Sequence, residues 1–523
     1  MRVLITERLD PAGFGCLQAD CQADLRLGLD TEQLIETIGD YDGLIVRSGT
    51  QVTEAVLEAG TRLQVVGRAG TGVDNIDIAA ATRRGVVVVN APTSNTVAVA
   101  EHTMALMLGL ARHICRANAT SHGGVWAKKQ LLGTELRNKT LGLVGLGRVG
   151  TGVARRAQAF EMHIIGFDPF VSPERAKQIG VALVDLDTLL STADYVSLHT
   201  PCTSRTRGMI GAPQLAMCKP TAYLINCARG GLIDGDALLD ALNSGTLTGA
   251  AIDVYADEPH IPEGFQSCER LLLTPHLGAS TQEAQADAAS EVVHQVLDVL
   301  NGRTPNHPVN VTALPSEEAA FLSPYLNLAT RMGRFYAQLA ANNLTHIEME
   351  YAGEIVGHDT DLLTRAVLAG ILSETGHGQV NIVNARLVAQ DHGLQLSEMT
   401  SDRSQGFSGL LTLRTRTTRA VRELSGAVIR GKPHILRIDG KWLDFVAEGH
   451  FLVDTHRDTP GIVGRAGSIL GEAGVNISFL QLGRDEPGGE AVMVLGLDEA
   501  IDGEMIERLE SQSGIESAHA INL

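Results

Sequence analysis

The first half of the chain alternates short apolar runs, rich in β-branched residues, with stretches of helical periodicity. Two series of runs can be distinguished. The first consists of RVLIT, GLIVRS, LQVVGRAG and GVVVVNAP, and the second of TLGLVGLG, HIIGFDP, YVSLHTP, AYLINCARGG, AAIDVY and LLLTPH. Strands that alternate with helices predict parallel sheets with crossover connections. Because an apolar helical stretch beginning near Val97 separates the two series, the pattern predicts two Rossmann-like, doubly wound α/β lobes.

The pattern changes after the helical stretch 283–300, at NGRTPNHPVNVTALP, where three prolines interrupt any periodicity. The next block combines a helical stretch, YLNLATRMGRFYAQLA, with strands such as THIEMEYAG and SGLLTLRTRT, which predicts an α+β intervening domain. From His450 the order strand, helix, strand, strand, helix, strand predicts a ferredoxin-like βαββαβ unit. We therefore expect one lobe at 1–97 and 279–308, a second at 98–278, an intervening domain at 309–449 and a terminal domain at 450–523.

Composition narrows the class of protein. Sixty-one acidic and 42 basic residues leave a formal net charge of −19, which argues against binding to nucleic acid or to an anionic membrane surface. Seven dispersed cysteines without a CxxC pair indicate free thiols in a reducing compartment. The charged start, MRVLITERLD, does not resemble a signal peptide, and the apolar runs are too short to span a membrane. We expect a soluble, cytoplasmic protein.

Gly145, Gly147 and Gly150 form a GxGxxG motif between the strand TLGLV and the helical stretch TGVARRAQAF. In a dinucleotide-binding turn the first glycine makes the turn, the second lets the backbone approach a pyrophosphate, and the third allows close helix packing. The motif alone also fits a plain tight turn. Asp168 ends the next strand, where a carboxylate would accept hydrogen bonds from ribose hydroxyls. Together these residues predict a site for NAD rather than NADP, because the acid would repel a 2′-phosphate.

Three further polar residues follow strands of the second series: Arg229 in NCARGG, Glu258 in YADEP and His276 in LTPHLGAS. Taken singly, they also fit a surface ion pair, a solvated loop charge and a loop histidine that caps a helix. The carboxyl ends of parallel strands meet at one edge of a sheet, so we expect the three side chains to lie together. There they would supply a clamp for a carboxylate, a proton shuttle and an acid that tunes the shuttle.

These segments resemble the D-isomer-specific 2-hydroxyacid dehydrogenase family, in the long form of the D-3-phosphoglycerate dehydrogenases. The matching segments are GLIVRSGTQV, VGRAGTGVDNID, GTELRNKTLGLVGLGRVG, NCARGGLID, AIDVYADEP and LTPHLGAST, followed by GQVNIVNARLVAQDHG and, as in ACT domains, DTPGIVGRAGSILGEAGVNIS. The resemblance implies a first lobe that binds substrate and a second that binds NAD. It also implies oxidation of D-3-phosphoglycerate to 3-phosphohydroxypyruvate, the first step of phosphorylated L-serine biosynthesis.

The resemblance assigns roles to individual residues. Arg229 binds the substrate carboxylate, His276 accepts the hydroxyl proton, and Glu258 favours the protonated form of His276. The cofactor site comprises Thr71, Gly145, Gly147, Arg148, Val149, Gly150, Asp168, Thr200, Cys227, Ala228, Arg229, Asp253, His276, Gly278 and Ala279. The substrate site comprises Arg47, Ser48, Arg68, Ala69, Gly70, Arg229 and His276, with Arg47 at the phosphate. No metal is implied.

In the terminal unit, the resemblance implies a regulatory site for L-serine at Asp458, Pro460, Gly461 and Asn476, although DxPG alone also fits a capped βα turn. A homodimer or homotetramer is implied as well. Two alternatives to the phosphoglycerate enzyme remain: another D-2-hydroxyacid dehydrogenase, and an NAD-sensing binding protein on the same fold. Arg47 and the long C-terminal extension argue against the first, and the intact set of Arg229, Glu258 and His276 weakens the second.

Overall fold

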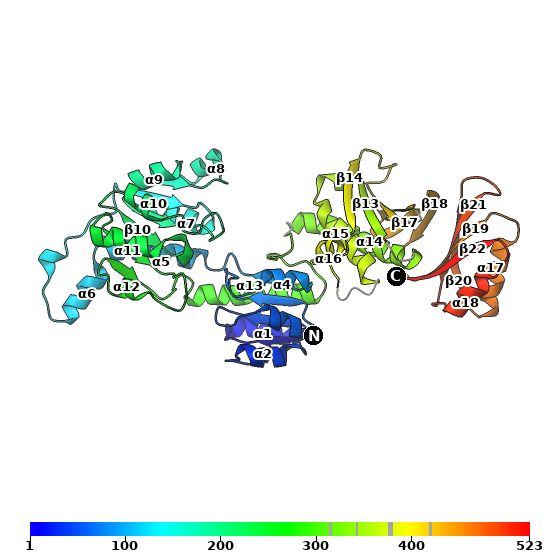
Figure 1. Cartoon of the computed structure of the whole chain (residues 1–523), viewed down its shortest axis with the longest axis horizontal. Coiled ribbons are helices and arrows are strands. Elements are labelled where there is room, and N and C mark those ends of the chain that lie inside the picture. Colours follow the sequence, from blue (N-terminus) through cyan, green and yellow to red (C-terminus); the bar gives the residue numbers. More distant parts are fainter. Residues whose placement is uncertain (313–315, 341–343, 375–379, 418–420) are drawn as a thin grey trace.

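The computed structural model describes residues 1–312, 316–340, 344–374, 380–417 and 421–523. Figure 1 shows an elongated molecule with the second lobe, in cyan and green, and the terminal domain, in red, at opposite ends. Four separate sheets organise the chain. Within the described ranges, no helix is both long and apolar enough to cross a membrane.

The first lobe is a parallel five-stranded sheet covered by helices on both faces. Its elements are β1 (Arg2–Ile5), α1 (Pro11–Asp20), β2 (Gln22–Leu25), α2 (Thr31–Ile38), β3 (Gly43–Val46), α3 (Glu54–Ala59), β4 (Val65–Arg68), α4 (Ile78–Arg83), β5 (Val87–Asn90) and α13 (Gln282–Leu300). The strand order is β2-β1-β3-β4-β5. Side chains alternate along a strand, so Val3 and Ile5 enter the core layer beneath α1 and α13, while Leu4 enters the layer beneath α2 to α4.

Helix α13 returns to the first sheet after the chain has built the second lobe. Gly67 of β4 makes room for it, because a Cβ at this position would lie 2.6 Å from Val292 Cγ1. The helix also packs Val293 and Val296 into the same core layer. The start of α13 thereby lies next to the carboxyl ends of the strands of the first sheet, where it helps to line a pocket.

The second lobe is a parallel seven-stranded sheet in the order β12-β11-β10-β9-β6-β7-β8. Its strands are β6 (Thr140–Val144), β7 (His163–Phe167), β8 (Ala182–Leu183), β9 (Tyr195–Leu198), β10 (Tyr223–Asn226), β11 (Gly249–Ile252) and β12 (Leu271–Leu273). Its helices are α5 (Thr96–Ala111), α6 (Ile114–His122), α7 (Arg148–Ala159), α8 (Pro173–Gln178), α9 (Leu186–Thr192), α10 (Ala212–Met217), α11 (Gly235–Ser244) and α12 (Glu263–Gln266). Helices α5 and α7 cover one face, and α9, α10 and α11 cover the other.

The intervening domain is a six-stranded sheet with two long helices packed on it. Its elements are α14 (Ser316–Leu339), β13 (Leu344–Gly353), α15 (Thr360–Ser373), α16 (Ala385–Asp391), β14 (Gln395–Ser401), β15 (Gly409–Thr417), β16 (Val421–Ile429), β17 (Lys432–Ile438) and β18 (Lys441–Val446). The order is β14-β13-β15-β16-β17-β18, with one parallel pair, β13 and β14, and antiparallel pairing elsewhere.

The terminal domain has the predicted βαββαβ order. Its elements are β19 (His450–Arg457), α17 (Ile462–Glu472), β20 (Ile477–Arg484), β21 (Glu490–Leu497), α18 (Gly503–Glu510) and β22 (Ile515–Asn522). Its antiparallel sheet, in the order β20-β21-β19-β22, packs one face on α17 and α18. The other face meets the intervening domain through aromatic rings, with Phe445 centred 5.3 Å from Phe451 and 6.0 Å from Phe479.

The predicted fold class is confirmed: two Rossmann-like lobes, a mixed α+β domain and a ferredoxin-like βαββαβ unit. The apolar runs of both series form strands. In the two lobes, two strands were not predicted: β2, whose sequence QADL is half polar, and β8, which has only two residues.

Candidate functional site

The dinucleotide fingerprint has the expected strand–turn–helix context between β6 and α7. Gly145 adopts a φ of +100°, in the left-handed region, and a Cβ at Gly150 would lie 2.1 Å from the Gly145 carbonyl oxygen. Both positions therefore require glycine. Gly147 caps α7, and since glycine has no capping side chain, the first N–H groups of the helix are left for an anion. Arg148, Val149 and Gly150 form the first turn of this helix.

Asp168 lies directly after β7, beside the fingerprint turn. Its Oδ2 accepts a hydrogen bond of 2.8 Å from the Leu146 backbone N–H, and its Oδ1 accepts one of 2.9 Å from Phe170. Thr200 contacts the same turn from the end of β9, since its Cγ2 would lie 2.9 Å from a Cβ at Gly145. The structure thus brings together the glycines, Asp168 and Thr200.

His199 precedes Thr200 and also lies against the fingerprint turn. Its ring Nε2 is 2.9 Å from the hydroxyl of Ser197, and its backbone oxygen would lie 2.6 Å from a Cβ at Gly145. Desolvation lowers the pKa of His199 to about 4, so the ring is neutral at physiological pH.

His276 and Glu258 form a close pair at the carboxyl edge of the second sheet. Nδ1 of His276 is 2.6 Å from Oε2 of Glu258, whose Oε1 accepts a bond of 2.9 Å from the Tyr255 N–H. The His276 side chain is 48% exposed. Because Nδ1 is engaged, Nε2 is the ring nitrogen that can reach a ligand.

Asp253 organises the loop that carries His276. Its carboxylate is buried, and Oδ1 accepts bonds from the Thr274 hydroxyl at 2.6 Å and the Leu277 N–H at 2.7 Å. Oδ2 accepts a bond of 2.9 Å from the Gly278 N–H, while the Asp253 carbonyl accepts one of 2.8 Å from the His276 N–H. Burial raises the pKa of Asp253, but hydrogen bonds with His102, Thr274 and the Leu277 N–H outweigh burial and the net shift is downward. The charged carboxylate therefore holds a loop in which His276 adopts a φ of +55°.

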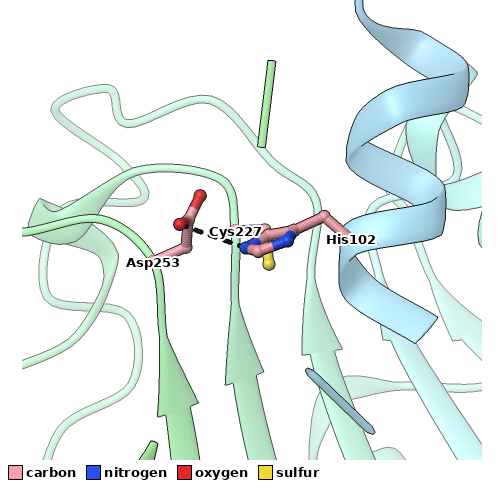
Figure 2. A group of neighbouring side chains, drawn as sticks. All are labelled: His102, Cys227 and Asp253. Atoms are coloured by element: carbon pink, nitrogen blue, oxygen red, sulfur yellow. Dashed lines mark hydrogen bonds and ion pairs between the residues drawn. The ribbon is translucent and has the colours of Figure 1, made fainter. Parts of the chain in front are cut away.

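Figure 2 shows His102 of α5 and Cys227 beside Asp253. Nε2 of His102 lies 3.2 Å from Asp253 Oδ1 and 3.3 Å from the Thr274 hydroxyl. Among the described residues this is the only acid, histidine and cysteine group compact enough to hold a metal ion. Desolvation raises the pKa of Cys227 to about 12, and Asp253 already accepts several hydrogen bonds. The group therefore fits a hydrogen-bonded network better than an ion.

Arg229 lies after β10 and makes an ion pair between the lobes. Its Nε is 3.3 Å from Oδ2 of Asp74, which follows β4 in the first lobe. Nη1 donates a bond of 2.8 Å to the carbonyl of Ala228. Asn226, buried at the end of β10, fixes the turn: its amide donates to the Arg229 carbonyl at 2.9 Å and its oxygen accepts from the Ala228 N–H at 3.0 Å. Asp74 and Asn226 were not predicted from the sequence.

The first lobe contributes two cationic side chains, Arg47 after β3 and Arg68 at the end of β4. Arg68 is largely buried, and burial, followed by the nearby charge of Arg229, lowers its pKa. Within the described part of the chain, its Nε finds no hydrogen-bond partner. A pocket of about 520 Å³ adjoins this region and is lined by Arg47, Ala69 and Gly70 together with the starts of α1 and α13. A cationic side chain with an unsatisfied donor, close to a pocket lined by a second arginine, is suited to an anionic ligand.

The remaining predicted residues lie on loops that follow strands of the two sheets. Ser48 is exposed on the loop after β3. The Thr71 hydroxyl donates to the Ala91 carbonyl at 3.1 Å, which ties the loop after β4 to the loop after β5. Ala279 follows Gly278 and lines the pocket. The predicted cofactor and substrate residues therefore lie at the carboxyl ends of strands in the two sheets, and the Arg229–Asp74 ion pair links the two lobes.

The predicted effector residues are divided between the two ends of the sheet of the terminal domain: Asp458 follows the end of β19, whereas Asn476 precedes β20 at the end where β19 begins. Asp458 pairs with Arg484 and accepts a bond of 3.1 Å from the Gly488 N–H, and these partners lower its pKa. Gly461, after Pro460, caps α17 with a φ of +95°. The Asn476 amide donates to Asp498 at 2.7 Å. The Asp458 carboxylate therefore already has a partner within the chain.

Three known domain families match successive parts of the sequence. Residues 104–278 match the NAD-binding domain of D-isomer-specific 2-hydroxyacid dehydrogenases, residues 321–439 the intervening domain of D-3-phosphoglycerate dehydrogenase, and residues 450–514 the ACT domain. The family order is the one expected from the sequence motifs.

Curated relatives match over the full length. The chain is 41% identical to D-3-phosphoglycerate dehydrogenase of Methanocaldococcus jannaschii, covering 100% of both chains. It is 40% identical to the Synechocystis enzyme of the same name over 100% of this chain and 95% of that one. Among solved structures, D-lactate dehydrogenase of Aquifex aeolicus complexed with NAD and lactic acid is 27% identical, with a TM-score of 0.53, over 58% of this chain and 96% of that one.

Proposed function

Since this chain belongs to the D-3-phosphoglycerate dehydrogenases of the D-isomer-specific 2-hydroxyacid dehydrogenase family, we propose that it oxidises D-3-phosphoglycerate to 3-phosphohydroxypyruvate with NAD. The observation that carries the proposal is the His276–Glu258 pair, at 2.6 Å, at the carboxyl edge of the second sheet. From the same edge Arg229 reaches Asp74 of the first lobe, and the charges of Arg229 and Arg47 act on Arg68. A proton acceptor and cationic groups for two anions are what this substrate requires.

Each residue has a chemical task in this reaction. Arg229 exchanges its contact with Asp74 for the substrate carboxylate, and its planar guanidinium orients C2. His276 accepts the C2 hydroxyl proton at Nε2, and Glu258 stabilises the resulting imidazolium through Nδ1. Bound NAD supplies the hydride acceptor. Arg47 and Arg68 hold the phosphate at the far end of the substrate.

The residues at the fingerprint fit the cofactor. Gly145, Gly147 and Gly150 leave backbone N–H groups for the pyrophosphate, and Asp168 exchanges one backbone donor for ribose hydroxyls. The carboxylate disfavours the 2′-phosphate of NADP.

Regulation and assembly complete the proposal. L-serine binds the ACT domain at the turn that contains Asp458, Pro460 and Gly461 and inhibits the enzyme. The chain acts as a homodimer or homotetramer in the cytoplasm. Trp126, at 91% exposure, and Leu132, at 88%, project from the segment after α6 and support assembly through that segment.

A panel of 2-hydroxy acids tests the proposal. With NAD, D-3-phosphoglycerate should give a higher kcat/KM than D-glycerate or D-lactate, and Arg47→Ala should raise the KM for D-3-phosphoglycerate while hardly changing that for D-glycerate. Preference for an unphosphorylated acid would support another D-2-hydroxyacid dehydrogenase. NAD binding without turnover of any acid would support a sensor protein.

A further inference from the structure

We infer that Glu7 is a positioning residue for substrate phosphate, because its carboxylate holds the backbone of the Arg47–Thr50 loop. The inference rests on the proposed function and extends it to a residue in β1–α1 that has not been assigned a role. Glu7 follows β1 directly and reaches the neighbouring loop after β3.

The carboxylate accepts three backbone hydrogen bonds from one loop. Oε1 accepts from the Arg47 N–H at 2.8 Å and from the Thr50 N–H at 3.0 Å, and Oε2 accepts from the Gly49 N–H at 3.2 Å. The loop connects β3 to the start of α3, so these N–H groups would otherwise need water as their acceptor. A negative charge enclosed by successive N–H groups fixes a loop conformation more firmly than neutral acceptors would.

The carbonyl side of the same loop is also fixed. The buried Asn75 amide donates to the Arg47 carbonyl at 2.7 Å and to the Thr50 carbonyl at 2.6 Å. The hydroxyls of Thr6 and Thr50 lie 2.8 Å apart. Three side chains from two segments therefore hold both ends of the loop, and Glu7 is the charged one that accepts from its N–H groups.

These contacts fix the backbone position from which the Arg47 side chain extends. Arg47 lines the pocket, and its Nη1 lies 3.5 Å from the Arg8 carbonyl. With its own N–H and carbonyl both fixed, Arg47 loses little conformational freedom when it binds an anion. Glu7 also favours the charged form of Arg68, which lies close by in the same cationic group. Loss of Glu7 should therefore weaken recognition of the phosphate end and leave the reacting end unchanged.

The test compares Glu7→Ala, Glu7→Gln and Asp42→Asn with the wild-type enzyme, using D-3-phosphoglycerate and D-glycerate. Glu7→Ala should raise the KM for D-3-phosphoglycerate by about tenfold or more, with kcat and the KM for D-glycerate changed by less than about threefold. Glu7→Gln should have a smaller effect, because its amide oxygen can replace Oε1, which accepts two of the three bonds. Asp42 is the matched control: it is buried at the opposite end of β3, where it accepts from the Arg2 N–H and pairs with Arg62.

A second measurement tests directly whether Glu7 stabilises the conformation of the loop. Hydrogen exchange of the amides of residues 47–50 should accelerate in Glu7→Ala and stay unchanged in Asp42→Asn. An unchanged KM for D-3-phosphoglycerate in Glu7→Ala, or equal losses with both substrates, would overturn the inference while the proposed function stands. Failure of the wild-type enzyme to oxidise D-3-phosphoglycerate would instead refute the proposed function, and the phosphate role of Glu7 with it.

Discussion

Replacement of Asp253 by Asn tests whether this carboxylate holds the His276 loop in place or binds the cofactor. In the wild-type enzyme both oxygens accept: Oδ1 from Thr274 and Leu277, and Oδ2 from Gly278. An amide can keep only one acceptor oxygen, and its NH2 group would then face a backbone N–H. At least one buried N–H group therefore loses its partner.

The magnitude follows from those contacts. A buried donor without a partner costs about 1–3 kcal/mol, and the remaining bonds lose the contribution of the charge, so a total of roughly 3–5 kcal/mol is expected. The loop will relax to recover part of this energy. Because a displacement of about 1 Å at a reacting group can cost about a hundredfold in rate, we expect kcat to fall about a hundredfold. The dissociation constant of NAD should change by less than about threefold, since the loop and not the fingerprint is affected.

The assay combines saturating kcat, NAD binding by calorimetry and thermal unfolding. Asp194→Asn is the matched control, because Asp194 accepts from the Thr140 N–H at 2.8 Å and pairs with Lys219 at the opposite end of the same sheet. It should lower the unfolding temperature with little change in kcat. A normal kcat in Asp253→Asn, accompanied by weak NAD binding, would refute the reasoning and assign the carboxylate to the nicotinamide.

Three further predictions address the cofactor, the effector and pH. Asp168→Ala should weaken NAD binding by about tenfold and reduce the preference for NAD over NADP. An unchanged ratio of the dissociation constants of NAD and NADP would mean that Asp168 does not hydrogen-bond to the ribose. Asp458→Ala should abolish inhibition in an L-serine titration of the initial rate and leave the uninhibited rate nearly intact, whereas undiminished inhibition would place the effector elsewhere. The pKa of His199 is about 4 in the folded protein and 6.5 in the unfolded chain. Between these pH values the unfolded chain therefore binds more protons than the folded protein, so the free energy of unfolding must fall as pH falls through this window. His199→Gln should lose less thermal stability than wild type over that window, and equal slopes would show that His199 does not contribute.

The arrangement of the fold could be predicted because most strands of the two lobes coincide with apolar, β-branched runs that end at glycine, proline or polar residues. In these lobes β2 and β8 were not predicted, because a half-polar edge strand and a two-residue strand do not contain an apolar run. GxGxxG and Asp168 could be placed by local spacing, and the structure brings them together at one turn.

The polar contacts that hold the site could not be predicted. Asp74 meets Arg229 across the cleft, and Glu7 binds a loop about 40 residues further along the chain; such pairings depend on the folded geometry. Asp253 was placed near the cofactor by resemblance. Its four close contacts to the His276 loop appear only when β11 and β12 are side by side.

The central claim is that His276, paired with Glu258, takes the proton from the C2 hydroxyl while Arg229 holds the carboxylate. The most direct measurement is the turnover of D-3-phosphoglycerate and the affinity for NAD in folded His276→Ala. The account predicts a loss of kcat of about 10²–10⁴-fold with NAD affinity nearly unchanged, because only the proton transfer is removed. A variant that binds NAD normally and turns over at close to the wild-type rate would contradict it.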